Sequence, residues 1–424
     1  MQKVCVIGLG YIGLPTASVL ATNGFEVVGV DVDPRVVDTI NAGSIHIEEP
    51  GLWTLVKAAT GSGRLRASLE PEKADIFFLA VPTPLTAEKK ADMSYVQSAA
   101  ERIVPYLEKG NLVILESTSP PGTCRNLLLP ILEKSGLKVG EDLLLAHCPE
   151  RVLPGRILNE LIRNDRIIGG FDTASAQRGQ EVYRSFVEGE IFLTDLTTAE
   201  MVKVVENTFR DVNIALANEI ALLCEDCGIS FAEVARLANR HPRVNLHQAG
   251  PGVGGHCISV DPWFLVEMFP GKARLVELAR RHNDSMPGQV VNRTLELIST
   301  VADPKVAVLG LAFKGNVDDI RESPALHVIE MLKERHVNVA VHDPHVKNGP
   351  IELSGLEACF QDSDCLLLLT DHDDYKYLNP RQVAKLMRSR ILFDTRNLLD
   401  HDDWRSAGFR VRVLGSGEGS CPTA

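Results

Sequence analysis

The sequence predicts an α/β protein with two Rossmann-like, doubly wound domains joined by a helical central region that contains one long connecting helix. Three observations support this fold class. Short apolar runs alternate with helical stretches in the first part of the chain, the same pattern recurs in weaker form near the end, and no strand pattern occurs at about residues 197–295. Such alternation is typical of a parallel sheet covered by helices. We expect domains at 1–196, 197–298 and 299–424.

The first domain begins with an apolar run at residues 3–7, as expected of a strand buried on both faces of a parallel sheet. A glycine-rich turn, a helix over residues 14–23 and a strand at residues 26–30 follow. Further strands are expected at residues 76–81, 112–115 and 143–146.

An internal repeat predicts the second Rossmann-like domain. Residues 305–311 repeat the pattern of residues 3–9, and the strand-like runs at 339–344 and 364–369 also have counterparts in the first domain. The second copy lacks the third glycine and has Phe313-Lys314 near its turn. We therefore expect it to hold something other than a dinucleotide bound in the same way.

The central region is predicted to begin with a long helix. Thr197-Thr198-Ala199-Glu200 is a plausible N-terminal cap, and the helical pattern continues towards Asp226. A helix of that length spans about 40 Å. It could also supply a dimer surface.

Composition limits the class of protein. The 44 basic and 56 acidic residues give a net charge of −12 without a long basic run, which argues against a nucleic-acid or anionic-membrane surface. The nine scattered cysteines, an odd number, are typical of reduced thiols. Because the sequence starts with a strand-like run, we expect no secretory leader, and no apolar run approaches the about 20 residues that a membrane helix needs. We expect a soluble cytoplasmic protein. Cys224 and Cys227 have no partner pair, so no metal site is expected.

The first glycine signature is typical of a dinucleotide site. Gly8, Gly10 and Gly13 follow a predicted strand and open a helix, and Asp31 ends the next strand. Such glycines let a pyrophosphate approach the helix N-terminus, and the carboxylate binds ribose hydroxyls. Because Asp31 would repel a 2′-phosphate, NAD is favoured over NADP, although Arg35 lies just behind. The alternative is a turn that serves only packing.

The second glycine signature carries a thiol. Four glycines lie among residues 250–255, followed by His256, Cys257 and, four residues later, Asp261. A thiol in such a loop can attack a carbonyl carbon, and the carboxylate can orient a proton or a water. We interpret His256 as a shape or substrate contact. The alternative for Cys257 is a small buried apolar residue.

Other candidate site residues lie on the long helix and on three loops. Lys203 and Asn207 are spaced i, i+4 and share one helix face, where an ammonium and an amide could hold a developing oxyanion. Residues 81–84, 117–123 and 148–151 each follow a predicted strand, at the edge where open α/β sheets bind ligands.

Taken in order, these motifs resemble the UDP-glucose/GDP-mannose dehydrogenase family along nearly the whole chain. Residues 150–155 and 250–258 look most like its UDP-N-acetyl-D-mannosamine dehydrogenase branch. Cys257-Ile258-Ser259-Val260-Asp261 departs from the Cys-Phe-Pro-Lys-Asp that is typical of the UDP-glucose enzymes.

The resemblance implies a four-electron oxidation of a C6 alcohol to a carboxylate with two NAD⁺ in succession. Cys257 would capture the aldehyde as a thiohemiacetal, and a second hydride transfer would give a thioester that water hydrolyses. The product would supply bacterial surface polysaccharide, and the family dimerises through its central helix.

The resemblance also implies the role of each site residue. The catalytic residues would be Cys257, Lys203, Asn207, Asp261, Glu150 and Thr118. The NAD contacts would be Gly8, Gly10, Tyr11, Ile12, Gly13, Asp31, Arg35, Thr83, Thr118 and Arg321. The UDP-sugar contacts would be Glu150, Arg151, Lys203, Asn207, Arg243, Gly254, His256, Phe313, Lys314 and Arg396, with Arg243 reaching a neighbouring subunit's site. The general base stays open among Asp261, Lys203 and Glu150.

Three alternatives remain at this point. UDP-N-acetylglucosamine or UDP-glucose could be the substrate, because nothing in the sequence measures the C2 configuration. A two-electron hydroxyacid dehydrogenase would have no need of Cys257. A non-enzymatic NAD-responsive binding protein would have little reason to keep Lys203, Asn207, Cys257 and Asp261 together.

Overall fold

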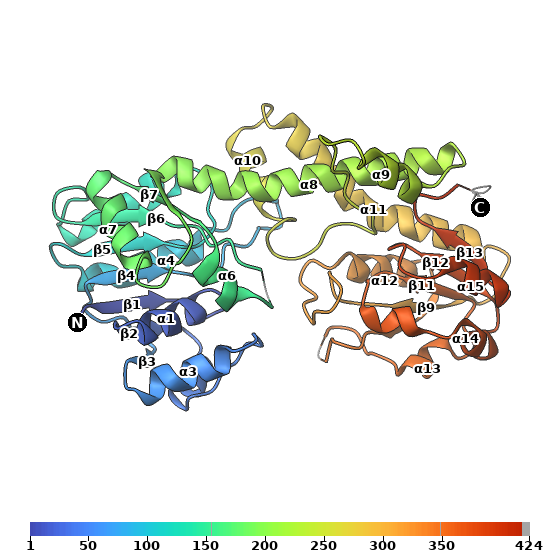
Figure 1. Ribbon diagram of the computed structural model, residues 1–424, viewed down its shortest axis with the longest axis horizontal. Helices are drawn as coiled ribbons and strands as arrows, with labels where there is room; N and C mark the ends of the chain where they lie inside the picture. The colour runs from blue at the N-terminus through green and yellow to red at the C-terminus, as the bar shows by residue number, and fades with distance from the viewer. Residues whose placement is uncertain (154, 348, 418–424) are drawn as a thin grey trace. The chain divides into compact units, whose positions relative to one another are not determined.

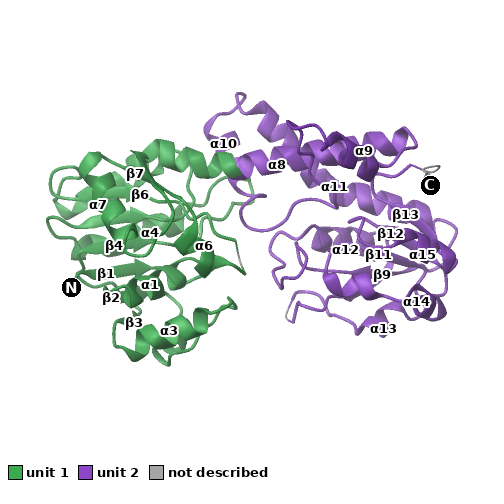
Figure 2. Ribbon diagram, viewed as in Figure 1, with its two compact units in different colours: residues 1–206 green, residues 207–424 purple. Residues whose placement is uncertain are grey.

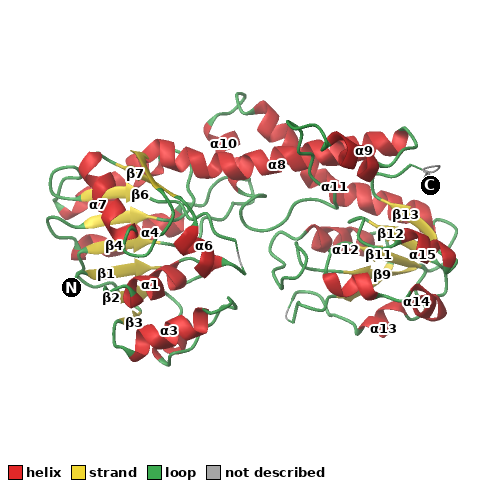
Figure 3. Cartoon of the chain, in the orientation of Figure 1, coloured by secondary structure: helices red, strands yellow, loops and turns green. Residues whose placement is uncertain are grey.

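The computed structural model describes residues 1–153, 155–347 and 349–417 (Figure 1). The chain divides into two compact units, residues 1–206 and 207–424 (Figure 2). Each unit contains one predominantly parallel sheet with helices around it (Figure 3). The predicted α/β class with two Rossmann-like sheets is confirmed, while the three-part domain boundaries stay a prediction.

The first unit is built on an eight-stranded sheet of order β3-β2-β1-β4-β5-β6-β7-β8, in which only the β6–β7 pair is antiparallel. Its strands are β1 (Lys3–Ile7), β2 (Glu26–Val30), β3 (Leu65–Ser68), β4 (Ile76–Leu79), β5 (Leu112–Leu115), β6 (Leu144–His147), β7 (Arg166–Gly170) and β8 (Ile191–Asp195). Its helices are α1 (Gly13–Thr22), α2 (Pro34–Asn41), α3 (Leu52–Gly61), α4 (Ser94–Ile103), α5 (Leu129–Leu132), α6 (Ile157–Arg163) and α7 (Thr173–Tyr183).

Both faces of this sheet are buried, which explains why β1 is an uninterrupted apolar run. Val4 and Val6 belong to a core cluster with residues of α1 and α3. Cys5 and Ile7 point to the opposite face and pack with residues of α4. Successive strand residues face opposite sides, so both sets must be apolar.

The second unit contains a five-stranded, all-parallel sheet of order β10-β9-β11-β12-β13. Its strands are β9 (Lys305–Leu309), β10 (Asn338–His342), β11 (Cys365–Leu368), β12 (Ile391–Asp394) and β13 (Arg410–Val413). Its helices are α9 (Phe231–Ala238), α10 (Asp261–Met268), α11 (Arg274–Ile298), α12 (Pro324–Glu334), α13 (Leu356–Phe360), α14 (Pro380–Leu386) and α15 (His401–Ser406).

The predicted long helix is α8 (Leu196–Asp226), which begins in the first unit and ends in the second. It starts one residue before the predicted cap, and the Asp195 carboxylate, rather than Thr197, accepts the Thr198 backbone N–H at 3.1 Å. Among the helices within the described residues, none is long and apolar enough to cross a membrane.

Candidate functional site

The glycine turn after β1 leaves open space at one position and is tightly packed at two. A Cβ on Gly13 would lie 1.8 Å from the Gly8 carbonyl oxygen, and one on Gly8, whose φ is +91°, would lie 2.7 Å from the Ala80 carbonyl oxygen. A Cβ on Gly10 would meet no atom within 4 Å. Gly8 and Gly13 are thus required by the fold, whereas Gly10 leaves space above the turn.

Asp31 lies at the end of β2 beside this turn. One carboxylate oxygen accepts the Leu9 backbone N–H at 3.0 Å and the other accepts the Asp33 N–H at 3.0 Å. Because each oxygen has a second lone pair, Asp31 can still accept hydroxyl groups of a ribose. Arg35 instead pairs with Asp33 at 2.7 Å and is 90% exposed. Tyr11 and Ile12 are half-buried at the start of α1.

Two loops that follow β4 and β5 meet at the same edge of the sheet. The Ser117 hydroxyl donates to the Val81 carbonyl at 2.6 Å, which brings together the loops that carry the half-buried Thr83 and Thr118. The buried Glu200 carboxylate of α8 accepts the backbone N–H groups of Gly122 and, at 2.8 Å, Cys124. Glu200 therefore fixes the second loop, a role that the capping interpretation of residues 197–200 missed.

Glu150 is buried after β6 and both of its carboxylate oxygens are held. One oxygen accepts the Arg151 backbone N–H and the other accepts Nη1 of Arg166, each at 2.7 Å. The Arg151 guanidinium pairs with Glu206 of α8 at 2.6 Å, and Lys203 is buried on the same helix.

A buried carboxylate also anchors the segment after Glu150. Glu49 accepts the backbone N–H groups of Gly155 and Ile157, each at 2.8 Å. Sequence reasoning missed both Glu49 and Arg166, because no motif distinguishes them from the chain's other charged residues.

In the second unit, the Cys257 loop leads directly into α10. The Cys257 carbonyl accepts the Asp261 backbone N–H at 2.9 Å, so the two residues lie one helical turn apart. The Asn207 amide of α8 donates to the Asp261 carboxylate at 2.5 Å. Asn207 and Asp261 are buried while Cys257 is half-buried. The structure thus brings together three of the predicted catalytic residues.

Buried polar side chains form hydrogen bonds with the backbone at both ends of the Cys257 loop. Asn218 of α8 accepts the Gly250 backbone N–H at 2.9 Å. At the other end, Arg280 of α11 reaches the Ile258 carbonyl at 3.5 Å and forms a buried ion pair with Asp211. Burial raises the pKa of Asp211 to about 6, although the Arg280 charge opposes the shift.

The same loop packs against predicted residues of the C-terminal region. The Gly255 backbone N–H donates to the Arg321 carbonyl at 2.9 Å. A Cβ on Gly254 would lie 2.7 Å from Cβ of Phe313, and one on Gly250 would lie 2.6 Å from Nη1 of Arg396. His256, Lys314 and Arg243 are exposed.

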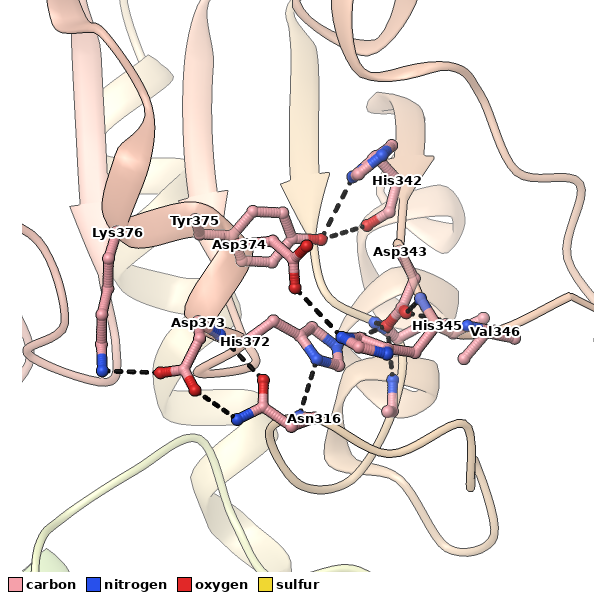
Figure 4. Close-up of polar contacts among 12 residues, drawn as sticks. Asn316, His342, Asp343, His345, Val346, His372, Asp373, Asp374, Tyr375 and Lys376 are labelled. Atoms are coloured by element: carbon pink, nitrogen blue, oxygen red, sulfur yellow. Dashed lines mark hydrogen bonds and ion pairs between the residues drawn. The ribbon is translucent and has the colours of Figure 1, made fainter. Parts of the chain in front are cut away.

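Asp343 is the counterpart of Asp31 in the second sheet, but its carboxylate is saturated (Figure 4). It accepts hydrogen bonds from five donors: Leu311 N at 2.7 Å, Ala312 N at 3.0 Å, His345 N at 2.9 Å, Val346 N at 3.0 Å and His372 Nε2 at 2.9 Å. A carboxylate has about four lone-pair sites, so Asp343 has none left for a ribose.

The tautomer of His372 follows from its second contact. Its Nδ1 accepts the Asn316 backbone N–H at 2.9 Å, so the proton that bonds Asp343 lies on Nε2. Burial alone raises the pKa of Asp343, but the hydrogen bonds from His372 and the backbone hold it well below its usual range. This geometry supports the expectation that the second Rossmann-like domain does not hold a dinucleotide as the first does.

Comparison with protein families agrees that the two Rossmann-like domains bind different ligands. Residues 2–187, 197–285 and 307–401 match, respectively, the NAD binding, central and UDP binding domains of the UDP-glucose/GDP-mannose dehydrogenase family.

Individual relatives are similar over nearly the full chain. The UDP-N-acetyl-D-mannosamine dehydrogenase of Methanococcus maripaludis strain C7 is 48% identical over 98% of both chains. The NDP-N-acetyl-D-galactosaminuronic acid dehydrogenase of Ralstonia nicotianae is 47% identical over 94% of this chain and 96% of that protein. The solved UDP-D-ManNAc dehydrogenase structure from Pyrococcus horikoshii is 42% identical and has a TM-score of 0.93. The match covers 98% of this chain and 100% of that one.

Proposed function

Because this chain belongs to the UDP-glucose/GDP-mannose dehydrogenase family and is an NAD-dependent nucleotide-sugar dehydrogenase, we propose that it oxidises UDP-N-acetyl-D-mannosamine at C6 to UDP-N-acetyl-D-mannosaminuronate. The observation that carries the proposal is near-full-length identity of about 48% to enzymes of that name. The uronate would supply cell-surface polysaccharide.

The first unit fits NAD. Gly10 leaves space for close approach of a pyrophosphate, and Asp31 keeps acceptor sites for the ribose. When bound, NAD supplies the hydride acceptor for each oxidation. Thr83 and Thr118 would line the same edge.

The residues of the chain carry the remaining chemistry. Cys257 would attack the C6 aldehyde, which keeps the intermediate bound as a thiohemiacetal, and would hold the acid as a thioester after the second oxidation. The Asn207 amide, bonded to Asp261, and the Lys203 ammonium would stabilise the developing oxyanion. Glu150 would accept a proton from the water that hydrolyses the thioester.

A second sugar remains a specific candidate. The 47% identity to the Ralstonia nicotianae protein favours a nucleotide-linked N-acetylgalactosamine sugar as the alternative. UDP-N-acetylglucosamine and UDP-glucose are the further alternatives in the same class.

The decisive experiment measures the NADH released per mole of limiting UDP-sugar for these four sugars in parallel. We expect two NADH from UDP-N-acetylmannosamine and little from the others. Two from another sugar would move the substrate, and one or none from all four would contradict the four-electron mechanism.

Cysteine substitution tests the thiol separately. Cys257→Ser should lower steady-state turnover by orders of magnitude, whereas Cys227→Ser, at an exposed cysteine outside the proposed site, should not. Full turnover of Cys257→Ser would instead favour two-electron chemistry.

We also propose a homodimer formed through α8. Phe209, Leu216 and Leu223 are spaced by seven residues on this helix and are 64%, 48% and 55% exposed. Apolar residues at that spacing form one stripe, as in helix–helix seams.

A further inference from the structure

Arg166, at the start of β7, places a buried positive charge directly on Glu150. Its side chain is 1% exposed, Nη1 donates to Glu150 Oε2 at 2.7 Å, and Nη2 donates to the Leu161 carbonyl at 3.0 Å. The guanidinium also lies 5.6 Å from the centre of the Tyr183 ring. Because arginine stays protonated in proteins, these contacts hold a permanent cation in one orientation.

A second buried carboxylate close to this group is held by hydroxyl groups. Glu116 accepts hydrogen bonds from the Tyr183 hydroxyl at 2.6 Å and the Thr16 hydroxyl at 3.3 Å. Burial, followed by the charge of Glu150, raises the pKa of Glu116 to about 7. Arg166 forms its ion pair with Glu150, and at Glu116 its charge only partly opposes the rise in pKa.

The geometry around Glu150 restricts its orientation without using all of its acceptor sites. Oε1 is held by the Arg151 backbone N–H and Oε2 by Arg166, each at 2.7 Å. A carboxylate has about four lone-pair sites. Each oxygen can therefore accept one further hydrogen bond in a direction set by the contact it already makes.

We infer that Arg166 is a positioning residue for the reaction, because it holds the Glu150 carboxylate in one orientation to accept a proton from the hydrolytic water. In that step the water oxygen bonds the acyl carbon, the C–S bond breaks, and its electron pair goes to Sγ of Cys257. One water proton passes to Glu150 and the other is released from the product acid, which leaves as the carboxylate. The inference rests on the proposed four-electron function.

The experiment compares Arg166→Met, Arg166→Lys, Glu150→Gln and the double variant by rapid mixing and by mass spectrometry of quenched protein. Arg166→Met should give a fast burst of two NADH per site, accumulate the Cys257 acyl-enzyme, and lose at least about tenfold in kcat with a smaller change in KM. Arg166→Lys should recover part of kcat.

The double-mutant cycle separates this role from a structural one. With Glu150→Gln already present, Arg166→Met should lower kcat by no more than about twofold, because the group it positions is gone. The double variant also removes both charges, which preserves folding better than leaving one charge unpaired. Arg293→Met is the control, since Arg293 forms a largely buried ion pair with Glu225 at 2.6 Å, and neither residue is a proposed site residue.

The inference is overturned if Arg166→Met lowers kcat equally in both backgrounds, or if it accumulates no acyl-enzyme and behaves like Arg293→Met. Failure of the proposed function is distinguished beforehand, because the unmodified enzyme would then not release two NADH per sugar.

Discussion

At the scale of single residues, Gly10 and Gly13 have different physical requirements although they share one motif. The Gly13→Ala methyl would overlap the Gly8 carbonyl oxygen at 1.8 Å, whereas the Gly10→Ala methyl would meet no atom within 4 Å. We expect Gly13→Ala to lower the free energy of unfolding by about 1–3 kcal/mol or more. Gly10→Ala should change it by less than about 1 kcal/mol and weaken NAD binding. Thermal unfolding and NAD titration of both variants check this, and equal effects on folding would contradict it.

Glu116 predicts a pH dependence of stability. Its pKa rises from 4.5 to about 7 on burial, so the folded state binds more protons than the unfolded state between these values. The free energy of unfolding should therefore fall as pH rises from 4.5 to about 7 and stay lower above that pH. Glu116→Gln should remove this fall and be more stable by roughly 3 kcal/mol at pH 8. Denaturant unfolding at pH 5 and pH 8 measures it, and an equal pH dependence of both proteins would refute it.

The residues that the sequence could not predict are those whose function depends on distant partners. Asp31 and Asp343 occupy equivalent places in the repeat, but only the structure places His372 against Asp343. Arg166 has no neighbouring signal that separates it from other arginines. By contrast, the predicted Asn207 and Asp261 meet, since helical spacing and a short glycine loop restrict where they can lie.

At the scale of elements, the Cys257 loop depends on two helices for its position. Asn218→Ala removes the acceptor of the Gly250 N–H and the amide that donates to Asn283 at 2.9 Å. We expect a loss of about 1–3 kcal/mol in the free energy of unfolding and a drop in kcat of about tenfold or more, because misplacing a nucleophile by about 1 Å is costly.

A matched control separates stability from loop position in this prediction. Asn41, like Asn218, makes two hydrogen bonds through its side-chain amide, here donating to the Ala67 carbonyl at 3.0 Å and accepting the Ala67 N–H at 2.8 Å. Because Asn41 is exposed and Asn218 is buried, Asn41→Ala should lose less stability, and it should keep kcat. Equal losses of kcat in the two variants would show that the loop contacts of Asn218 have no special effect.

The strands that the sequence predicted are mostly continuous apolar runs. The strands expected at residues 3–7, 26–30 and 112–115 have those bounds in the structure. Strands β3, β7, β8, β12 and β13 were not predicted. β8 has no fully buried residue within Ile191–Leu193, and β3 alternates buried and exposed positions over only four residues. Edge strands bury less surface, so their sequences carry a weaker apolar signal.

At the scale of the whole molecule, the two sheets share a strand pattern but differ in their capacity to bind a ligand. The first sheet has the order β3-β2-β1-β4-β5-β6 at its core and leaves Asp31 able to accept hydrogen bonds. The second has the order β10-β9-β11-β12-β13 and saturates Asp343. The similarity of the repeats was visible in the sequence, whereas their different capacity for ligands depends on hydrogen bonds that form only in the folded chain.

The proposed dimer gives the last prediction at this scale. Phe209→Glu and Leu216→Glu each place a charge on the exposed stripe of α8, where burial against another subunit would leave it unpaired and strongly disfavoured. We expect both variants to sediment as monomers at micromolar concentration, while the unmodified chain sediments as a dimer. Tyr377→Glu, at an apolar side chain that is 86% exposed outside α8, should remain dimeric. Dimers of unchanged affinity in both α8 variants, or a monomeric unmodified chain, would rule out this surface. The folded subunit should survive either substitution, so circular dichroism distinguishes dissociation from unfolding.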